Sequence, residues 1–174
     1  CARSWPPVAG FATAYSLLAP YEAGYVDDAD DQGGETIDGI ARVHHPAWPG
    51  WPLIDAYKRA ASDARPFLLT PAQWSTLRPL ILDFYRAEFW DRLRGTDLAS
   101  QAIADELLEA AVLLGRDRAV RFLQIALNLA NDRARRWGEL VVSGQVDAGT
   151  IEAVRAALRT RRDHYVVTLQ NIQQ

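Results

Sequence analysis

The sequence contains no methionine, one cysteine (Cys1) and one lysine (Lys58). A lone cysteine cannot form an internal disulfide, which excludes a disulfide-stabilised scaffold. A chain without an initiator methionine is not an intact translation product, so we expect a segment excised from a longer protein. Its 174 residues are enough for one domain with a sizeable core.

The sequence also lacks a long apolar run and an excess of positive charge. Its formal net charge is −3, whereas a nucleic-acid-binding protein usually presents a basic face. No apolar segment approaches the roughly 20 residues that a membrane-spanning helix needs, and residues 1–10 lack the apolar core of a signal peptide. We therefore expect no nucleic-acid partner and no stable membrane span. Cys1 would fit a processed lipoprotein or the edge of an excised segment.

A helical pattern is present over most of the chain, which predicts a mainly α fold. Thr70-Pro71, with Gln73 completing a capping box, signals the start of a helix. Gly115 follows a stripe of apolar residues and signals the end of another helix. Residues 24–39, rich in glycine and aspartate, predict a loop or short hairpin. The expected helices cover residues 11–21, 53–62, 70–93 with a kink or break at Pro79, 100–114, 117–129, a helix capped by Asp147 or Thr150 that reaches about Thr160, and a last stretch through Ile172. Residues 140–146 could form a short strand and turn.

The segment Glu22–Ile40 contains the candidate catalytic residues of the sequence. A carboxylate at the end of a helix, beside aromatic residues, should have a raised pKa, as a general acid near neutral pH requires. A loop that doubles back could bring Asp31 and Thr36 opposite Glu22, with room for a sugar or a water. Two carboxyl groups flanking a glycosidic bond are the minimal device of a glycosidase. The same residues could also form a helix end followed by a solvated acidic loop.

This segment resembles the signature of the glycoside hydrolase family 108 N-acetylmuramidases, in which E-G-G-Y, D-x-G-G-x-T and G-I follow in order. The residues in register are Glu22, Gly24, Tyr25, Asp31, Gly33, Gly34, Thr36, Gly39 and Ile40. Residues 84–90 are similar to the family's Y-R-x-x-Y-W helix and residues 119–128 to its A-x-x-x-L-Q-x-A-L-N helix. Residues 140–154 resemble its D-G-x-x-G-x-x-T segment, so the resemblance covers about residues 11–160.

The resemblance implies a lysozyme-like muramidase domain over residues 11–130, after an N-terminal tail at 1–10. Residues 131–174 would form a C-terminal helical segment, similar to a peptidoglycan-binding domain and packed on the same unit. The implied activity is hydrolysis of the β-1,4 bond between N-acetylmuramic acid and N-acetylglucosamine in peptidoglycan. It would need no metal and no organic cofactor.

The resemblance also implies roles for four residues. Glu22 corresponds to the catalytic acid of the family. By similarity to phage lysozymes of the wider superfamily, Asp31 and Thr36 would place a water across the sugar from the acid. Tyr25 would stack on a sugar or position the loop.

Five residues depart from the family pattern. Ala23 replaces a glycine, and Glu35 replaces a small residue before the motif threonine. Ile37 and Asp38 stand where asparagine and tyrosine are common, and Leu114 stands where an asparagine is expected. The changes at Ile37, Asp38 and Leu114 remove polar groups that could bind substrate.

Other candidate sites are less specific. Trp48 and Trp51, in a connector rich in proline, could line a saccharide cleft or pin the connector to the helices. Residues 28–33 partly match a calcium loop but lack the glutamate expected at its twelfth position. The adjacent His44 and His45 do not have zinc-ligand spacing, so we expect no metal site.

Three rival functions stay open beside the muramidase. They are a non-catalytic peptidoglycan-binding or structural module, a lytic transglycosylase, and a host-interaction protein on the same scaffold. A muramidase acts outside the cytoplasmic membrane, so we expect a secreted or periplasmic protein. An endolysin, a secreted lysin and an antibacterial effector all fit, and an effector would imply a cognate immunity protein.

Overall fold

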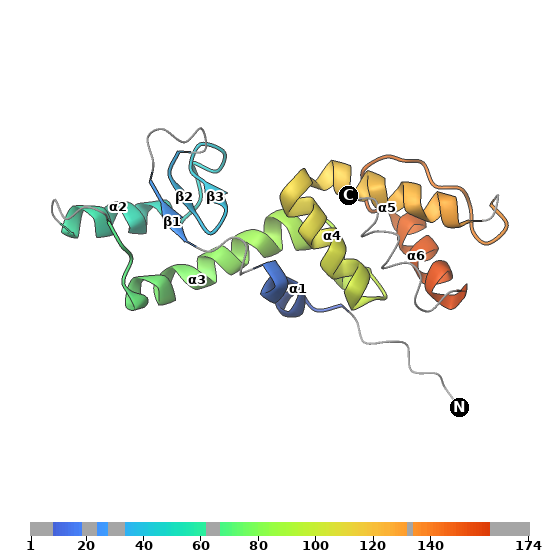
Figure 1. Ribbon diagram of the computed structural model, residues 1–174, viewed down its shortest axis with the longest axis horizontal. Coiled ribbons are helices and arrows are strands. Elements are labelled where there is room, and N and C mark those ends of the chain that lie inside the picture. The colour runs from blue at the N-terminus through green and yellow to red at the C-terminus, as the bar shows by residue number, and fades with distance from the viewer. Residues whose placement is uncertain (1–8, 19–23, 28–33, 62–66, 132–133, 161–174) are drawn as a thin grey trace, which may run out of the picture. The chain divides into compact units, whose positions relative to one another are not determined.

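The computed structural model describes residues 9–18, 24–27, 34–61, 67–131 and 134–160, and these are mainly helical (Figure 1). The elements in chain order are α1 (Phe11–Leu18), β1 (Tyr25–Val26), β2 (Thr36–Ile37), β3 (Ile40–Ala41), α2 (Trp51–Ala60), α3 (Pro71–Tyr85), the π-helix η1 (Arg86–Trp90), the 3-10 helix η2 (Gly95–Asp97), α4 (Gln101–Leu114), α5 (Arg116–Ala130) and α6 (Ala148–Thr160). The predicted fold class, a mainly α lysozyme-like domain with a hairpin after the first helix, is confirmed.

The chain divides into two compact units, each with its own apolar core. The hairpin unit spans Leu18–Tyr85, and the helical unit joins Cys1–Leu17 to Arg86–Gln174. The largest fully buried side chains of the hairpin unit are Ile37, Ile40, Ile54, Leu77, Ile81 and Tyr85. Those of the helical unit are Trp90, Leu98, Ile103, Leu108, Leu123 and Leu127.

The hairpin unit contains a three-stranded antiparallel sheet in the order β1-β2-β3. A two-residue turn, Asp38-Gly39, joins β2 to β3, and the φ angles of these residues are 41° and 76°. Positive φ at both positions is the geometry of the tightest hairpin turns, in which Asp-Gly is a preferred pair. The turn therefore sets the register that pairs Ile37 with Ile40, and both side chains are buried.

Helix α3 begins with the predicted capping box. The backbone amide of Thr70 donates to Gln73 Oε1 at 2.8 Å, and the amide of Gln73 donates to Thr70 Oγ1 at 3.3 Å. Of the kink or break expected at Pro79, the break is wrong, because α3 continues through Pro79 to Tyr85, and the kink stays a prediction. Pro79 and Ser75 are both exposed, so water can satisfy the Ser75 carbonyl that the proline cannot bond.

The helical geometry changes further along, in η1. The amide of Asp91 donates to the Arg86 carbonyl at 2.9 Å, five residues back, which is the π-helical pattern. The Arg116 guanidinium donates to the Glu88 carbonyl inside this turn at 2.7 Å. The predicted single helix over residues 70–93 is therefore α3 followed by a π-helical turn.

The helical unit is built on α4, α5 and α6, of which α5 packs against both others (Figure 1). Ser100 caps α4 by accepting the Ile103 amide at 3.4 Å. Gly115, with φ at 88°, ends α4 and is the single residue before α5. Asp147 caps α6 by accepting the Thr150 amide at 2.7 Å. The predicted bounds of these three helices agree with the structure to within two residues.

A row of polar side chains on α5 and its C-cap residue binds the connector that precedes α6. The expected strand at residues 140–146 is wrong, because this stretch pairs with helix side chains instead of a neighbouring strand. In this row Arg121 donates to the Val142 and Ser143 carbonyls, Gln124 bonds Gly144 and Gln145, Asn128 bonds both backbone groups of Leu140, and Asn131 bonds the backbone of Trp137.

Candidate functional site

Of the residues predicted to be catalytic, Thr36 lies within the described part of the chain. Thr36 lies in β2, and its hydroxyl donates to the Gly34 carbonyl at 3.3 Å. Glu22 and Asp31 lie outside the described residues, and their roles stay predictions. Tyr25, predicted to stack on a sugar or position the loop, lies in β1 and pairs with Ile37.

The hairpin presents two different faces. Residues paired across antiparallel strands share a face, and successive residues alternate between faces. Thr36 pairs with Val26, which is 50% exposed, so these two side chains share one face. Tyr25 lies on the other face, where its hydroxyl donates to Glu35 Oε1 at 2.7 Å. Thr36 is therefore turned away from the contacts that hold Tyr25.

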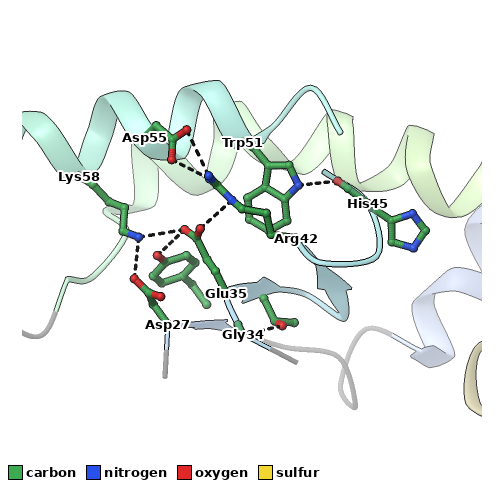
Figure 2. A network of polar contacts seen from close by, with 10 residues as sticks. Asp27, Gly34, Glu35, Arg42, His45, Trp51, Asp55 and Lys58 are labelled. Carbon is green, nitrogen blue, oxygen red and sulfur yellow. Dashed lines mark hydrogen bonds and ion pairs between the residues drawn. The ribbon is translucent and has the colours of Figure 1, made fainter. Parts of the chain in front are cut away.

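Glu35 is the centre of a polar network on the Tyr25 face (Figure 2). Its side chain is 10% exposed and contacts three partners: Tyr25 in β1, Arg42 just after β3, and Lys58 in α2. Besides the Tyr25 hydroxyl, Oε1 contacts Lys58 Nζ at 3.1 Å, and Oε2 contacts Arg42 Nε at 2.7 Å. Glu35, which replaces a small residue of the family pattern, is thus a mostly buried carboxylate that contacts two cations and a phenol.

The two cations have second carboxylate partners, which extend the network to α2. Arg42 makes a bidentate contact with Asp55, at 2.6 and 3.3 Å, and stacks over the Trp51 ring at 4.6 Å. Lys58 Nζ contacts Asp27 Oδ2 at 2.6 Å. The network therefore ties β1, β2 and the end of β3 to one helix.

The pKa shifts of Tyr25, Lys58 and Asp55 keep these three groups in one protonation state near neutral pH. Burial raises the pKa of Tyr25, and Glu35 raises it further, so the phenol stays a donor. Burial lowers the pKa of Lys58, but its contacts with Asp27, Tyr25 and Glu35 outweigh burial and raise it. The hydrogen bond from Arg42 lowers the pKa of Asp55. These fixed charges suit a structural support better than a proton-transfer site.

Glu35→Gln should lower the free energy of unfolding by about 1–3 kcal/mol, because an amide nitrogen would then face the Arg42 or Lys58 cation. Denaturant unfolding followed by circular dichroism measures this change. Asp27→Asn is the matched control, since Asp27 is 48% exposed and its surface ion pair contributes at most about 1 kcal/mol. Equal losses for the two variants would contradict a central role for Glu35.

Three other departures from the family pattern also have defined positions. Ile37 is fully buried, so it belongs to the core of the hairpin unit. Asp38 is 6% exposed, and its Oδ1 accepts the Gly24 amide at 2.9 Å. Leu114, at the end of α4, is 39% exposed. Of these three residues, Asp38 has a polar side chain, and it binds the backbone amide of Gly24, two residues after Glu22 in the sequence.

Trp48 and Trp51 pack against each other edge to face, with ring centroids 5.1 Å apart. They are 6% and 3% exposed, and each indole nitrogen donates to a backbone carbonyl, of Leu80 and His45 respectively. These contacts are those of residues that anchor a connector. Their predicted contact with a saccharide stays a prediction, limited to the small area that each ring exposes.

Gly50→Ala tests how tightly this connector packs. A Cβ at Gly50 would overlap the Trp48 ring. The φ of −73° at Gly50 suits alanine, so backbone strain should not add to the effect of this overlap. We expect a loss of about 1–3 kcal/mol in the free energy of unfolding. Gly138→Ala is the control, because a Cβ there would meet nothing within 4 Å. A thermal unfolding midpoint that falls equally in both variants would disprove the clash.

Sequence reasoning missed the network around Glu35 and the role of Asp38. Asp38 carried a usable signal, since Asp-Gly between two apolar pairs is a strong hairpin pattern. The partners of Glu35 carried no such signal, because Arg42, Tyr25 and Lys58 are 7, 10 and 23 residues away from Glu35 in the sequence and no periodic pattern links them. Only the closed hairpin beside α2 brings them together (Figure 2).

Within the described ranges, no group of three or more His, Cys, Asp or Glu side chains is placed to hold a metal ion. No helix in that part of the chain is long and apolar enough to cross a bilayer.

Comparisons with known proteins add a family match and two similar proteins. The sequence model described as glycosyl hydrolase 108 matches residues 15–115, more than half of the chain. The chain is 29% identical over 127 residues to the tRNA N6-adenosine threonylcarbamoyltransferase of Thermotoga neapolitana, covering 63% of this chain and 39% of that protein. It thus spans about two fifths of that relative's length. The structure of Brucella abortus SagA matches with a TM-score of 0.59 and 26% identity, covering 92% of this chain and 75% of that one.

Proposed function

This chain belongs to the glycosyl hydrolase 108 family, and on that basis we propose that it hydrolyses the β-1,4 bond between N-acetylmuramic acid and N-acetylglucosamine in bacterial peptidoglycan. Family membership makes it a glycoside hydrolase, and at family level it supports peptidoglycan as the substrate. The observation that carries the proposal is that the matched residues 15–115 contain the whole segment Glu22–Ile40. The likeness to SagA over 92% of the chain supports the same family.

In the proposed reaction Glu22 protonates the glycosidic oxygen, which leaves as the 4-hydroxyl of N-acetylglucosamine. A water adds to the anomeric carbon of N-acetylmuramic acid, and Asp31 with Thr36 takes up its proton or orients it. Asp31 also stabilises the oxocarbenium-like transition state by its charge. Support for Thr36 is its position in β2, on the face of the hairpin that Glu35 and its partners leave free.

The substrate determines where the enzyme would act. Peptidoglycan lies outside the cytoplasmic membrane, so the protein would work as a secreted, periplasmic or phage-delivered enzyme. If it is an antibacterial effector, the producing cell would need an immunity protein against it. The tRNA modification named for the Thermotoga neapolitana relative is not proposed, because this chain has a net charge of −3 and covers 39% of that protein.

A second candidate function is a peptidoglycan-binding module that has lost hydrolysis. The observation that favours it is that Ile37 and Leu114, which replace expected polar residues, are a core residue and an apolar surface residue. Neither can donate or accept a hydrogen bond through its side chain. Such a module would bind sacculi and release no fragments.

The purified chain incubated with peptidoglycan sacculi separates these functions. Muramidase action should lower the turbidity and release fragments whose N-acetylmuramic acid is a reducing end, as identified by mass spectrometry. Co-sedimentation with sacculi without released fragments would favour the binding module. Fragments that end in 1,6-anhydromuramic acid would show a lytic transglycosylase and would overturn the hydrolytic mechanism.

A further inference from the structure

Helix α5 presents apolar side chains to solvent on a third face. Its buried face belongs to the core of the helical unit, and its polar row binds the connector before α6. The remaining face carries Phe122, Ile125 and Leu129, whose spacing of three and four residues makes them neighbours on a helix. Phe122 is half-buried, whereas Ile125 is 40% and Leu129 is 76% exposed.

The connector adds Val141 to this stripe. Two side chains of the polar row bind the backbone on either side of Val141, at Leu140 and Val142, so the connector runs back along α5 (Figure 1). Val141 is therefore held beside α5 at about the level of Ile125, and it is 79% exposed. Contiguous exposed apolar side chains mark an interaction surface, unlike single ones scattered over a protein. We call four residues the apolar ridge: Phe122, Ile125, Leu129 and Val141.

Arginines stand at both ends of the apolar ridge. Arg118 is exposed and lies one turn before Phe122 on the same face of α5. Arg135 and Arg136 are exposed in the turn that follows α5. Within the described ranges these three arginines have no carboxylate partner, whereas other arginines of the helical unit do. Glu139 in the connector offsets one of the three charges, which leaves the ends of the ridge positive.

The position of these charges decides what the ridge can bind. If a second copy packed on it through a two-fold axis, the two ridges would run parallel or antiparallel, and arginine would face arginine in both cases. Like charges brought together at an interface cost free energy, which disfavours self-association. An anionic surface is complementary to both ends. The ridge is also convex, so a lipid surface can deform around it, whereas a protein partner would need a matching acidic groove.

We propose that the apolar ridge is a peripheral binding site for a bilayer surface that contains anionic lipids. The ridge side chains would enter the boundary between headgroups and acyl chains, and the three arginines would pair with lipid phosphates. Both parts are needed, because a few apolar side chains bind a bilayer weakly and each arginine raises the binding constant about fivefold. This site goes beyond the proposed hydrolysis and does not depend on it.

Vesicle flotation of the full chain tests the site. The probes are vesicles of phosphatidylcholine alone and vesicles of phosphatidylcholine and phosphatidylglycerol in a ratio of about 2:1. At low ionic strength we expect at least about tenfold tighter binding to the anionic vesicles. This preference should disappear near about 0.5 M salt, because salt screens the arginine charges.

Two pairs of variants locate the binding on the ridge. Leu129→Asp should weaken binding to anionic vesicles at least about tenfold, because it replaces an apolar side chain by a negative charge. Leu68→Asp is the matched control, since Leu68 is also 76% exposed but belongs to the hairpin unit. Arg118→Gln should weaken binding about fivefold. Arg92→Gln removes the same charge from an arginine that pairs with Glu88, and it should change binding less than about twofold.

The outcomes separate the possible occupants of the ridge. Equal binding to both kinds of vesicle, or equal losses in Leu129→Asp and Leu68→Asp, would overturn the proposal. A dimer in sedimentation that Leu129→Asp dissociates would assign the ridge to a second copy and overturn it as well. No binding to either kind of vesicle would also overturn it and leave the ridge to a protein partner.

Discussion

Replacing Glu22 with glutamine should lower the rate of peptidoglycan hydrolysis by about 10²- to 10⁴-fold, which is the usual contribution of a general acid. Glutamine has nearly the size of glutamate, so substrate binding should change little. It cannot give a proton to the departing glycosidic oxygen, so the leaving group would depart as an alkoxide. The measurement is the initial rate of reducing-end release from sacculi, with kcat and KM determined separately.

The control for this variant is Glu139→Gln, which makes the same chemical change at an exposed position of the helical unit. It should leave both the rate and the unfolding midpoint unchanged. Equal clearing of sacculi by Glu22→Gln and the unchanged chain would show that Glu22 is not the acid. Loss of activity with a large fall in the unfolding midpoint would point to a structural role instead.

Gln124→Ala should destabilise the helical unit by about 2–4 kcal/mol, because the buried Gly144 amide, the part-buried Gln145 carbonyl and the buried Thr150 hydroxyl would each lose a partner. The Gln124 side chain is fully buried. Its Oε1 accepts the Gly144 amide at 3.0 Å, and its Nε2 donates to the Gln145 carbonyl at 2.9 Å. Nε2 also lies 3.2 Å from Thr150 Oγ1 at the start of α6. One side chain thus binds the connector and α6 to α5.

Gln145→Ala is the matched control, since the Gln145 side chain is exposed and its contacts to Gln124 and Ser143 use the backbone. It should change the free energy of unfolding by less than about 0.5 kcal/mol. Urea unfolding followed by circular dichroism measures both variants. A loss below about 1 kcal/mol in Gln124→Ala would mean that water replaces the amide at these backbone groups.

Much of the fold could be predicted because its signals are local. The reciprocal bonds of Thr70 and Gln73, the Ser100 cap and the stop at Gly115 each depend on residues within one helical turn. The expectation was wrong where it allowed a break at Pro79, because the cost of the missing amide there depends on whether that face of the helix is exposed. It also failed at residues 140–146, whose partners lie on α5 and not on a strand.

The candidate site could be predicted as a motif but not as an arrangement. Family resemblance pointed to Glu22, Asp31 and Thr36, and the described hairpin contains Thr36 on a partly exposed face. Glu35 and Asp38 were noticed as unusual residues, yet their roles depend on contacts across the hairpin. Charge pairing between distant segments follows from closure of the fold and leaves no periodic trace in the sequence.

Lys58 gives the network around Glu35 a chemical consequence. It is the only lysine in the sequence, and its raised pKa leaves very little free amine at neutral pH. Acylating reagents attack the uncharged amine, so the ε-amino group of Lys58 should label slowly while Asp27 and Glu35 hold it. The rate of labelling at Lys58 would therefore report whether the hairpin is closed onto α2.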